Sequence, residues 1–188
     1  MKAFKKLQDL PLSTSLFLIL AVVITLLCGL VFGSAQQIYR QSANDPQIQI
    51  SEDMADYLSQ GKDVSAIVPK QEVDISKSLV WFVIDYNDKG EVVASNAKLD
   101  GLTPALPFGV LDHTRQNGQN RVTWEPKEGV RIAAVITKYN GGAVLVGRSL
   151  RETEIRTHML GKRVMLAWLV TLAAAFAGTW FLLNKKSH

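Results

Sequence analysis

The sequence predicts an α+β domain, built on one antiparallel sheet, between two membrane-spanning helices. Uncharged apolar runs cover residues 16–32 and 164–183 of the 188-residue chain. Each run is about long enough, at roughly 1.5 Å per residue, to cross a hydrocarbon core of about 30 Å. Between them lies a succession of short strands and helices, which one antiparallel sheet with helices packed on it satisfies.

The apolar runs divide the chain into five segments. We expect transmembrane helices over 14–35 and 163–183, one exported domain over 36–162, and short flanks at 1–13 and 184–188. Both flanks are basic, and short basic flanks favour the cytoplasmic side of a membrane. The sequence therefore predicts a bacterial inner-membrane protein with both termini in the cytoplasm and a periplasmic or extracellular central domain.

The distribution of charge argues against a nucleic-acid partner. The chain has a net charge of +4 and a pI near 9.2, which by itself could indicate nucleic-acid binding. The segment 36–162, however, holds 15 Lys/Arg and 16 Asp/Glu, a net charge of −1. The positive excess lies at the membrane edges, where anionic lipid headgroups attract it.

The first apolar run leaves two alternatives open. It could be a cleaved signal peptide, because Gly33, Ser34 and Ala35 offer small residues at a cleavage site. We favour an uncleaved anchor, since the run is long for a signal peptide. Cys28 is the only cysteine, so no internal disulfide can form. Gly29 and Gly33 have helix-pairing spacing, which leaves both dimerisation and intramolecular pairing open.

The central domain is expected to begin with a helix. Asp45 can cap it, Pro46 fits the first helical position, and Gly61 is placed to end it. Apolar residues then recur at helical spacing at Ile50, Met54, Tyr57 and Leu58.

Strands dominate the rest of the domain. We predict five, over 79–84, 91–95, 121–125, 130–139 and 143–148. The first is apolar on both faces, as in a central strand, and a turn at 87–90 joins it to the second. The loop-like segment 97–118 contains a short helix at about 107–116. Along 130–139, Ile132 shares one face with Val130, whereas Arg131 lies on the other.

The chain leaves the domain through a capping box. Ser149 can cap a helix and Glu152 can reach back to it, and no proline interrupts the path to Val164. The last strand thus feeds a helix that continues into the second span. Such a helix could deliver a shift of the sheet to the membrane as a piston or rotation, or it could be a stalk that carries no signal.

Two segments carry a family resemblance. VIDYNDKGEVVASNAKLDG (83–101) and VLVGRSLRETEIR (144–156) are similar to the first hairpin and the exit segment of PAS-like, single Cache extracytoplasmic sensor domains of bacterial receptors. The resemblance implies a PAS-like five-stranded antiparallel sheet with an N-terminal helix, flanked by two transmembrane helices. Receptors of this kind carry an output domain after the second span, where this sequence has five residues. Any output is therefore expected from a separate protein.

Motifs for catalysis are absent from the sequence. There is no P-loop, no nucleotide-binding glycine fingerprint, no H-E-x-x-H and no nucleophile elbow. The histidines, His113, His158 and His188, are too far apart in sequence to suggest a metal site. We expect no enzyme, no cofactor and no metal.

A ligand pocket, if the domain binds a small molecule, is expected on the sheet face under residues 97–118. The candidate lining residues are Trp81, Asp85, His113, Arg121, Trp124, Arg131 and Tyr139. Arg131 interrupts an apolar strand and could bind a carboxylate bidentately. Alternatively, Arg131 faces water or pairs with Glu125 across a hairpin, and Asp85 is a turn residue.

The sequence thus favours a membrane-anchored, sensor-like protein. Its outer domain would bind a small molecule or a protein partner and relay to a separate signalling or assembly protein. The alternative is an assembly or structural protein whose outer domain docks a partner and senses nothing. The expected contacts are membrane lipid, a small-molecule ligand, a protein partner and a second copy in a homodimer, with no nucleic acid.

Overall fold

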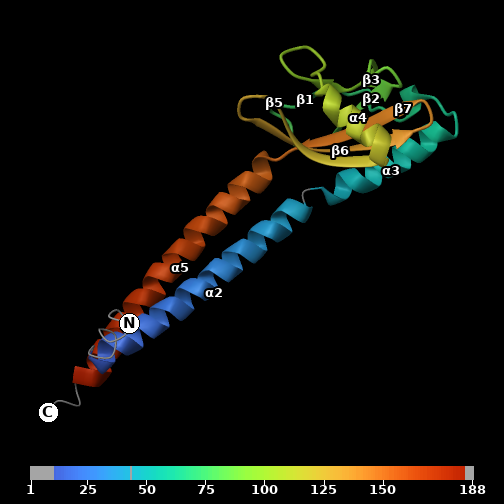
Figure 1. Ribbon diagram of the computed structural model, residues 1–188. Helices are drawn as coiled ribbons and strands as arrows, with labels where there is room; N and C mark the ends of the chain where they lie inside the picture. The colour runs from blue at the N-terminus through green and yellow to red at the C-terminus, as the bar shows by residue number, and fades with distance from the viewer. Residues whose placement is uncertain (1–10, 43, 185–188) are drawn as a thin grey trace. The chain divides into compact units, whose positions relative to one another are not determined.

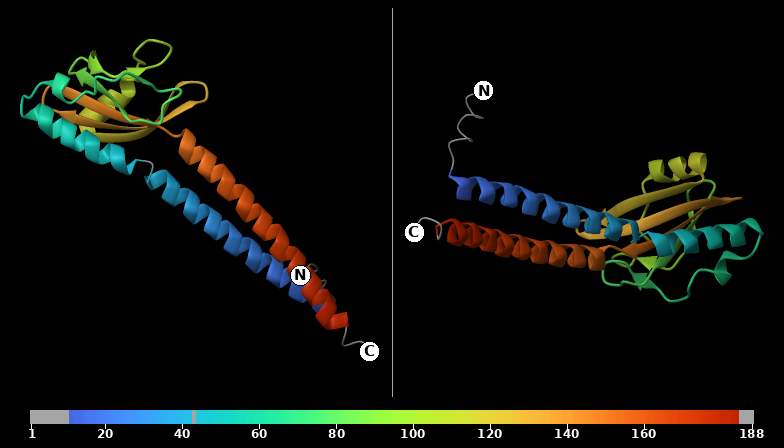
Figure 2. Two further views of the ribbon diagram at one scale, coloured as in Figure 1. Left: turned by 180° about the vertical axis from the view of Figure 1, so that it is seen from behind. Right: turned by 90° about the horizontal axis from the view of Figure 1, so that it is seen from below.

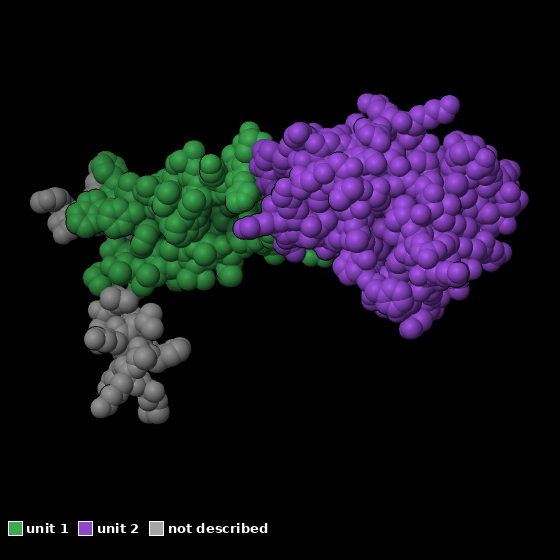
Figure 3. Space-filling view, turned by 90° about the horizontal axis from the view of Figure 1, so that it is seen from above, with its two compact units in different colours: residues 1–38, 156–188 green, residues 39–155 purple. Residues whose placement is uncertain are grey.

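The computed structural model describes residues 11–42 and 44–184. The chain divides into two compact units, coloured separately in Figure 3. The hairpin unit comprises residues Met1–Ile38 and Arg156–His188, and the sheet unit comprises Tyr39–Ile155. Of the predicted basic flanks at 1–13 and 184–188, residues 1–10 and 185–188, with His188, lie outside the described residues.

The hairpin unit is formed by two long helices, α2 (Leu12–Ser42) and α5 (Arg151–Asn184). They run antiparallel and side by side in Figures 1 and 2. Both are long and apolar enough to cross a membrane, by length and composition. Their side chains meet at regular intervals: Gly161 lies against the Phe32 ring, Trp168 Nε1 donates to Thr25 Oγ1 at 3.0 Å, and Phe176 packs edge-on against Phe17.

The glycine spacing in α2 does not mediate this helix pairing. A Cβ added at Gly29 or Gly33 would have no atom within 4 Å. The contacts of α5 instead fall on larger α2 side chains, seven or eight residues apart. Of the two alternatives left open, intramolecular pairing through the two glycines is therefore not found within the described residues, and dimerisation through them stays a prediction.

The sheet unit has the predicted α+β architecture, a five-stranded antiparallel sheet preceded by a helix. The strand order is β3-β2-β7-β6-β5. The strands are β2 (Phe82–Asn87), β3 (Val92–Ser95), β5 (Gln119–Lys127), β6 (Val130–Tyr139) and β7 (Gly142–Ser149). Two helices complete the layers, α3 (Asp45–Ser59) and α4 (Phe108–Asn117). All neighbouring strands pair antiparallel, and β2 lies inside the sheet, as its apolar composition predicted.

Both faces of the sheet are covered, by α3 on one side and α4 on the other (Figure 2). On the α4 face, Phe82, Ile132 and Leu145 pack in one buried cluster with Leu111 of the helix. The α3 face is formed by a second cluster, which contains Met54, Ala55, Leu58, Val83, Val144 and Val146. The alternation predicted along β6 is confirmed, since Ile132, Ala134 and Ile136 all belong to the α4 face.

Several local features differ from the sequence-based expectation. Asn44, not Asp45, is the N-cap of α3, and it makes no side-chain cap bond. Strand β2 begins at Phe82 rather than 79. Three short elements were not predicted: η1 (Val64–Ala66), β1 (Val73–Asp74) and β4 (Ala97–Lys98), the last two forming a parallel pair. Elements of two or three residues are too short to show a hydrophobic period.

Candidate functional site

The sheet face beneath residues 97–118, where a ligand pocket was expected, is packed with side chains. Leu106 and Leu111 lie in one cluster with Phe82, Tyr86 and Trp124, all at most 9% exposed. The Tyr86 hydroxyl is buried, and burial raises the pKa of Tyr86 against a smaller lowering effect of the Leu106 backbone. Apolar packing therefore occupies the place predicted for a ligand.

The seven candidate residues do not converge on one site. Trp124 is buried on the α4 face, whereas Trp81 and Tyr139 pack on the α3 face. His113 is exposed on α4, where Asn117 lies beside its ring. Arg121 is exposed and donates two hydrogen bonds to Gln119 Oε1. Side chains split between two faces of a sheet cannot line a common pocket.

Asp85 and Tyr139 are the two candidates that the fold does bring together. Asp85 is 1% exposed and lies inside β2, so the alternative of a turn residue was wrong; Asn87 closes the following turn by accepting from Lys89 N and Glu91 N. Tyr139 Oη donates to Asp85 Oδ1 at 2.9 Å. Because β7 lies between β2 and β6, this bond links two strands that are not neighbours.

The environment of this pair opposes ionisation of both groups. Burial raises the pKa of the Asp85 carboxyl, against the lowering effect of the hydrogen bond from Tyr139. Burial also raises the pKa of Tyr139, and the hydrogen bond and charge of Asp85 raise it further. The pair is suited to a structural link in the core.

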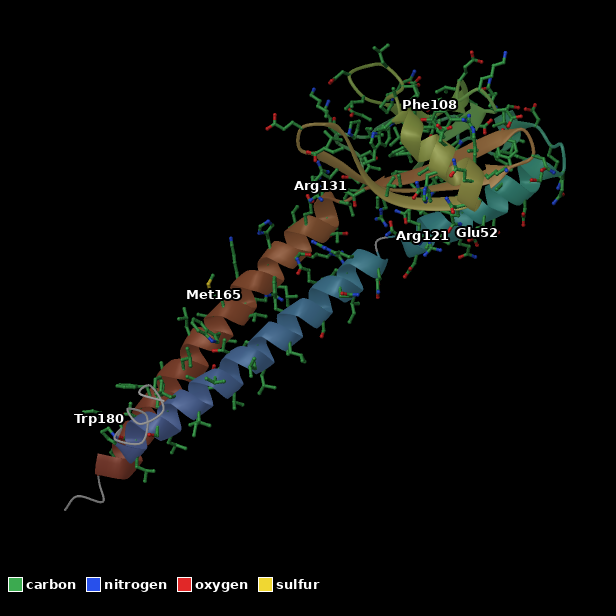
Figure 4. All side chains as sticks on the ribbon, in the orientation of Figure 1. Glu52, Phe108, Arg121, Arg131, Met165 and Trp180 are labelled. Carbon is green, nitrogen blue, oxygen red and sulfur yellow. The ribbon has the colours of Figure 1, made fainter. Side chains whose placement is uncertain are left out.

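Arg131 has a partner that the sequence reasoning missed. Its Nη1 lies 2.5 Å from Glu154 Oε1, in the first turn of α5. The predicted alternative partner, Glu125, instead accepts from Gly129 N in its own hairpin. Both members of the ion pair are about half exposed, with side-chain exposures of 47% and 40%. Figure 4 shows Arg131 next to the start of α5.

Three further hydrogen bonds secure the same place. Leu150 N donates to Arg131 O at 2.8 Å. Arg148 Nε donates to Leu79 O at 2.9 Å, and Arg151 Nη2 donates to Lys77 O at 2.7 Å.

We call this cluster the exit junction; it comprises Arg131, Arg148, Leu150, Arg151 and Glu154. It ties the beginning of α5 to β6 and to the segment that precedes β2. The capping sequence after the last strand was the signal that pointed to it, and Ser149 Oγ accepts from Arg151 N at 3.3 Å.

The described residues hold no metal site, and the comparisons with known proteins return no match. In the part of the chain that the structure describes, no group of three or more His, Cys, Asp or Glu could hold a metal ion. No protein-family model matches the chain, and no curated protein and no solved structure matches it.

Proposed function

We propose that this chain is a non-enzymatic, membrane-anchored relay protein. Its PAS-like sheet unit, exported beyond the membrane, docks a protein partner, and α5 carries the effect to a separate protein. The exit junction is the observation that carries this proposal. A helix joined to the sheet only by its chain connection would move independently of it. The Arg131–Glu154 pair and the bond from Arg151 to Lys77 O couple the first turn of α5 to β6 and to the segment before β2.

A protein partner fits the sheet unit better than a small molecule does. Both sheet faces are filled by buried side chains, while several large apolar residues remain on the surface. Val93, Leu102 and Phe108 are 55%, 74% and 63% exposed, and Phe108 is labelled on α4 in Figure 4. Exposed aromatic and aliphatic side chains are typical anchors of protein interfaces.

The membrane arrangement is part of the same proposal. We place α2 and α5 across a bilayer, with both termini in the cytoplasm. Leu26 and Leu30 of α2 and Leu166 of α5 are 64–67% exposed, which is favourable in lipid but costly in water. Backbone N–H and C=O groups without hydrogen bonds would be costly in lipid. A helix avoids this cost because its backbone groups bond to one another.

A passive docking protein is the second candidate. Leu106, Leu111, Leu145 and Phe82 fill the sheet face, as expected for a domain that binds no small molecule. In that case the exit junction stiffens a stalk and relays nothing.

Photo-crosslinking in intact cells tests both candidates. A photoreactive amino acid replaces Phe108 on the sheet unit or Leu166 on α5, each in the full-length chain. The relay proposal predicts a specific crosslinked protein from each position, and passive docking predicts one from position 108 alone. As a control, the label replaces Ile136, which is fully buried and should yield no crosslink. If neither exposed position crosslinks above this background, both candidates are contradicted.

A further inference from the structure

The described residues of the hairpin unit carry positive charge and no acidic residue of their own. Its described residues, 11–38 and 156–184, contain no Asp or Glu. They contain three cations and one histidine, at Arg156, His158, Lys162 and Arg163. All four lie within the eight residues that precede the uncharged run beginning at Val164. The charge is therefore concentrated at one end of the apolar part of α5.

These side chains point away from α2. Arg156, His158, Lys162 and Arg163 are exposed, whereas Thr157, Leu160, Gly161 and Val164 are half-buried. The half-buried set includes Gly161, which lies against Phe32 of α2, so it marks the side of α5 that faces its neighbour. At about 100° per residue, His158, Lys162 and Arg163 fall on the opposite half of the helix, and Arg156 lies at its edge.

Lys162 and Arg163 have no counter-charge within the described chain. Neither residue takes part in the ion pairs of the sheet unit, such as the pair between Arg131 and Glu154, and the described residues of the hairpin unit offer them no carboxylate. Two adjacent, exposed cations next to an apolar helix surface require an anion from outside the chain. Met159 and Met165, 47% and 58% exposed, flank them with apolar surface; Figure 4 shows Met165 projecting from α5 on the side away from α2.

We propose that Lys162 and Arg163, with His158 and Arg156 beside them, form a binding site for the phosphate of an anionic phospholipid headgroup. The inference rests on the proposed membrane-spanning hairpin, because the end of an apolar span places these residues at headgroup level. An arginine fork and a lysine ammonium are the two side chains best suited to a phosphate. The neighbouring methionines supply contact for the acyl chains. A free phosphate would use the cations alone, so a lipid fits the combined surface better.

Lipid binding by the full-length chain can be measured by native mass spectrometry in an uncharged detergent. Phosphatidylglycerol and phosphatidylcholine with identical acyl chains are titrated separately. Each surface cation contributes about 5-fold to anionic lipid binding, so Lys162→Gln with Arg163→Gln should weaken phosphatidylglycerol binding on the order of 30-fold. Phosphatidylcholine binding should be weaker than phosphatidylglycerol binding and unaffected by the substitutions.

The control removes the same charge elsewhere. Lys70 and Lys89 are exposed on the sheet unit, and their double substitution by Gln should leave lipid binding unchanged. Circular dichroism of each variant confirms that the helices remain. Equal wild-type affinity for the two lipids, or unchanged binding by the Lys162/Arg163 variant, would overturn the proposal. Displacement of the lipid by inorganic phosphate at its own binding concentration would instead assign the site to a free anion. The crosslinking experiment is scored separately, so a failed relay and a failed lipid site are distinguishable.

Discussion

Asp85 is the buried carboxyl whose ionisation the fold opposes. It is 1% exposed and accepts one hydrogen bond from Tyr139. Because burial raises its pKa above the ordinary 3.8, the folded state holds its proton to higher pH than the unfolded state does. The contribution of this group to stability is therefore most favourable in acid and declines as pH rises through the folded-state pKa.

Replacing Asp85 by Asn removes this titration while retaining a carbonyl that can accept from Tyr139. We expect Asp85→Asn to raise the melting temperature of the full chain near about pH 7, where the carboxyl ionises freely in the unfolded wild type but burial opposes its ionisation in the folded state. Below the ordinary pKa of 3.8, the difference between the two proteins should shrink towards zero. Asp53→Asn, which removes an exposed carboxyl of α3, is the control. A difference that does not vary with pH would contradict the prediction.

Gly142 is required by close backbone approach. A Cβ at this position would collide with the carbonyl oxygen of Tyr86 and lie 2.9 Å from the Tyr139 hydroxyl oxygen. Gly142→Ala should therefore destabilise the sheet unit by about 1–3 kcal/mol, the usual cost of overpacking. Gly109 of α4 has no atom within 4 Å of an added Cβ. The same change there should stabilise by about 0.5–1 kcal/mol. Denaturant unfolding of both variants measures the two free energies, which should differ in sign.

For single residues, the sequence predicted the strand face on which a side chain lies better than it predicted the residue that the side chain contacts. The two-residue period placed Ile132 and Arg131 on opposite faces of β6, as observed. The partner of Arg131 could not be predicted, because Glu154 is 23 residues away and meets it only once β7 has paired with β6 and α5 has begun. The same holds for Asp85 and Tyr139, which are 54 residues apart.

The exit junction is an element-scale feature because its bonds join α5 to strands formed elsewhere in the chain. The Arg131–Glu154 pair is half-exposed, so it should contribute only about 0.2–1 kcal/mol. Its expected effect is local: Arg131→Glu or Glu154→Arg should speed amide hydrogen exchange in the first turn of α5. The double exchange of charges should restore slow exchange by re-forming the pair in reverse.

The matched control is a similar pair that does not touch α5. Lys127 Nζ lies 2.8 Å from Asp100 Oδ2, and both side chains are exposed. Lys127→Glu should leave exchange in α5 unaltered. If the two single variants and the wild type exchange equally in that turn, the junction does not hold the helix.

Among the elements, those with a clear hydrophobic period or turn chemistry were predicted. The helix after Pro46, the hairpin closed at Gly90 and the three long strands are confirmed, and Gly90 has φ +83° as that turn requires. The small parallel pair of β1 and β4 was missed. Asn96 helps to place it: its Oδ1 accepts from Val83 N at 2.7 Å, and its Nδ2 donates to Gln71 O at 3.2 Å. Here the Asn96 side chain makes bonds to the backbone that a neighbouring strand would otherwise make. Such a substitute leaves no periodic pattern in the sequence.

For the whole molecule, the membrane assignment depends on the two apolar helices. We expect the full-length chain to remain with the membrane fraction after extraction at alkaline pH. Leu169→Arg places a charge in the middle of the second run, at a cost of about 2.5–3.5 kcal/mol for insertion, and should lower the membrane-retained fraction. Val93→Arg, which adds the same charge at an exposed site of β3, should not. A wild-type chain released into the aqueous fraction would contradict the assignment.

Of the candidate functional features, the exit helix was predicted from the sequence, whereas the residues that form the exit junction were not. The capping sequence at Ser149 indicated a continuous exit helix, which α5 is. That the domain is membrane-anchored and non-enzymatic stays a prediction. The expected ligand pocket stays a prediction, and Leu106 and Leu111 of the covering segment pack onto the sheet where it was expected. A sequence does not show whether a covering segment leaves space beneath it.

The three regular contacts between α2 and α5 limit how the hairpin can transmit motion. Sliding one helix along the other would break the hydrogen bond from Trp168 to Thr25 and separate the Phe17 and Phe176 rings. Tilting or turning both helices as one body would preserve every one of these contacts. In the proposed relay, a displacement of α5 would therefore be shared by α2. The receiving protein would contact a pair of helices instead of a single moving helix.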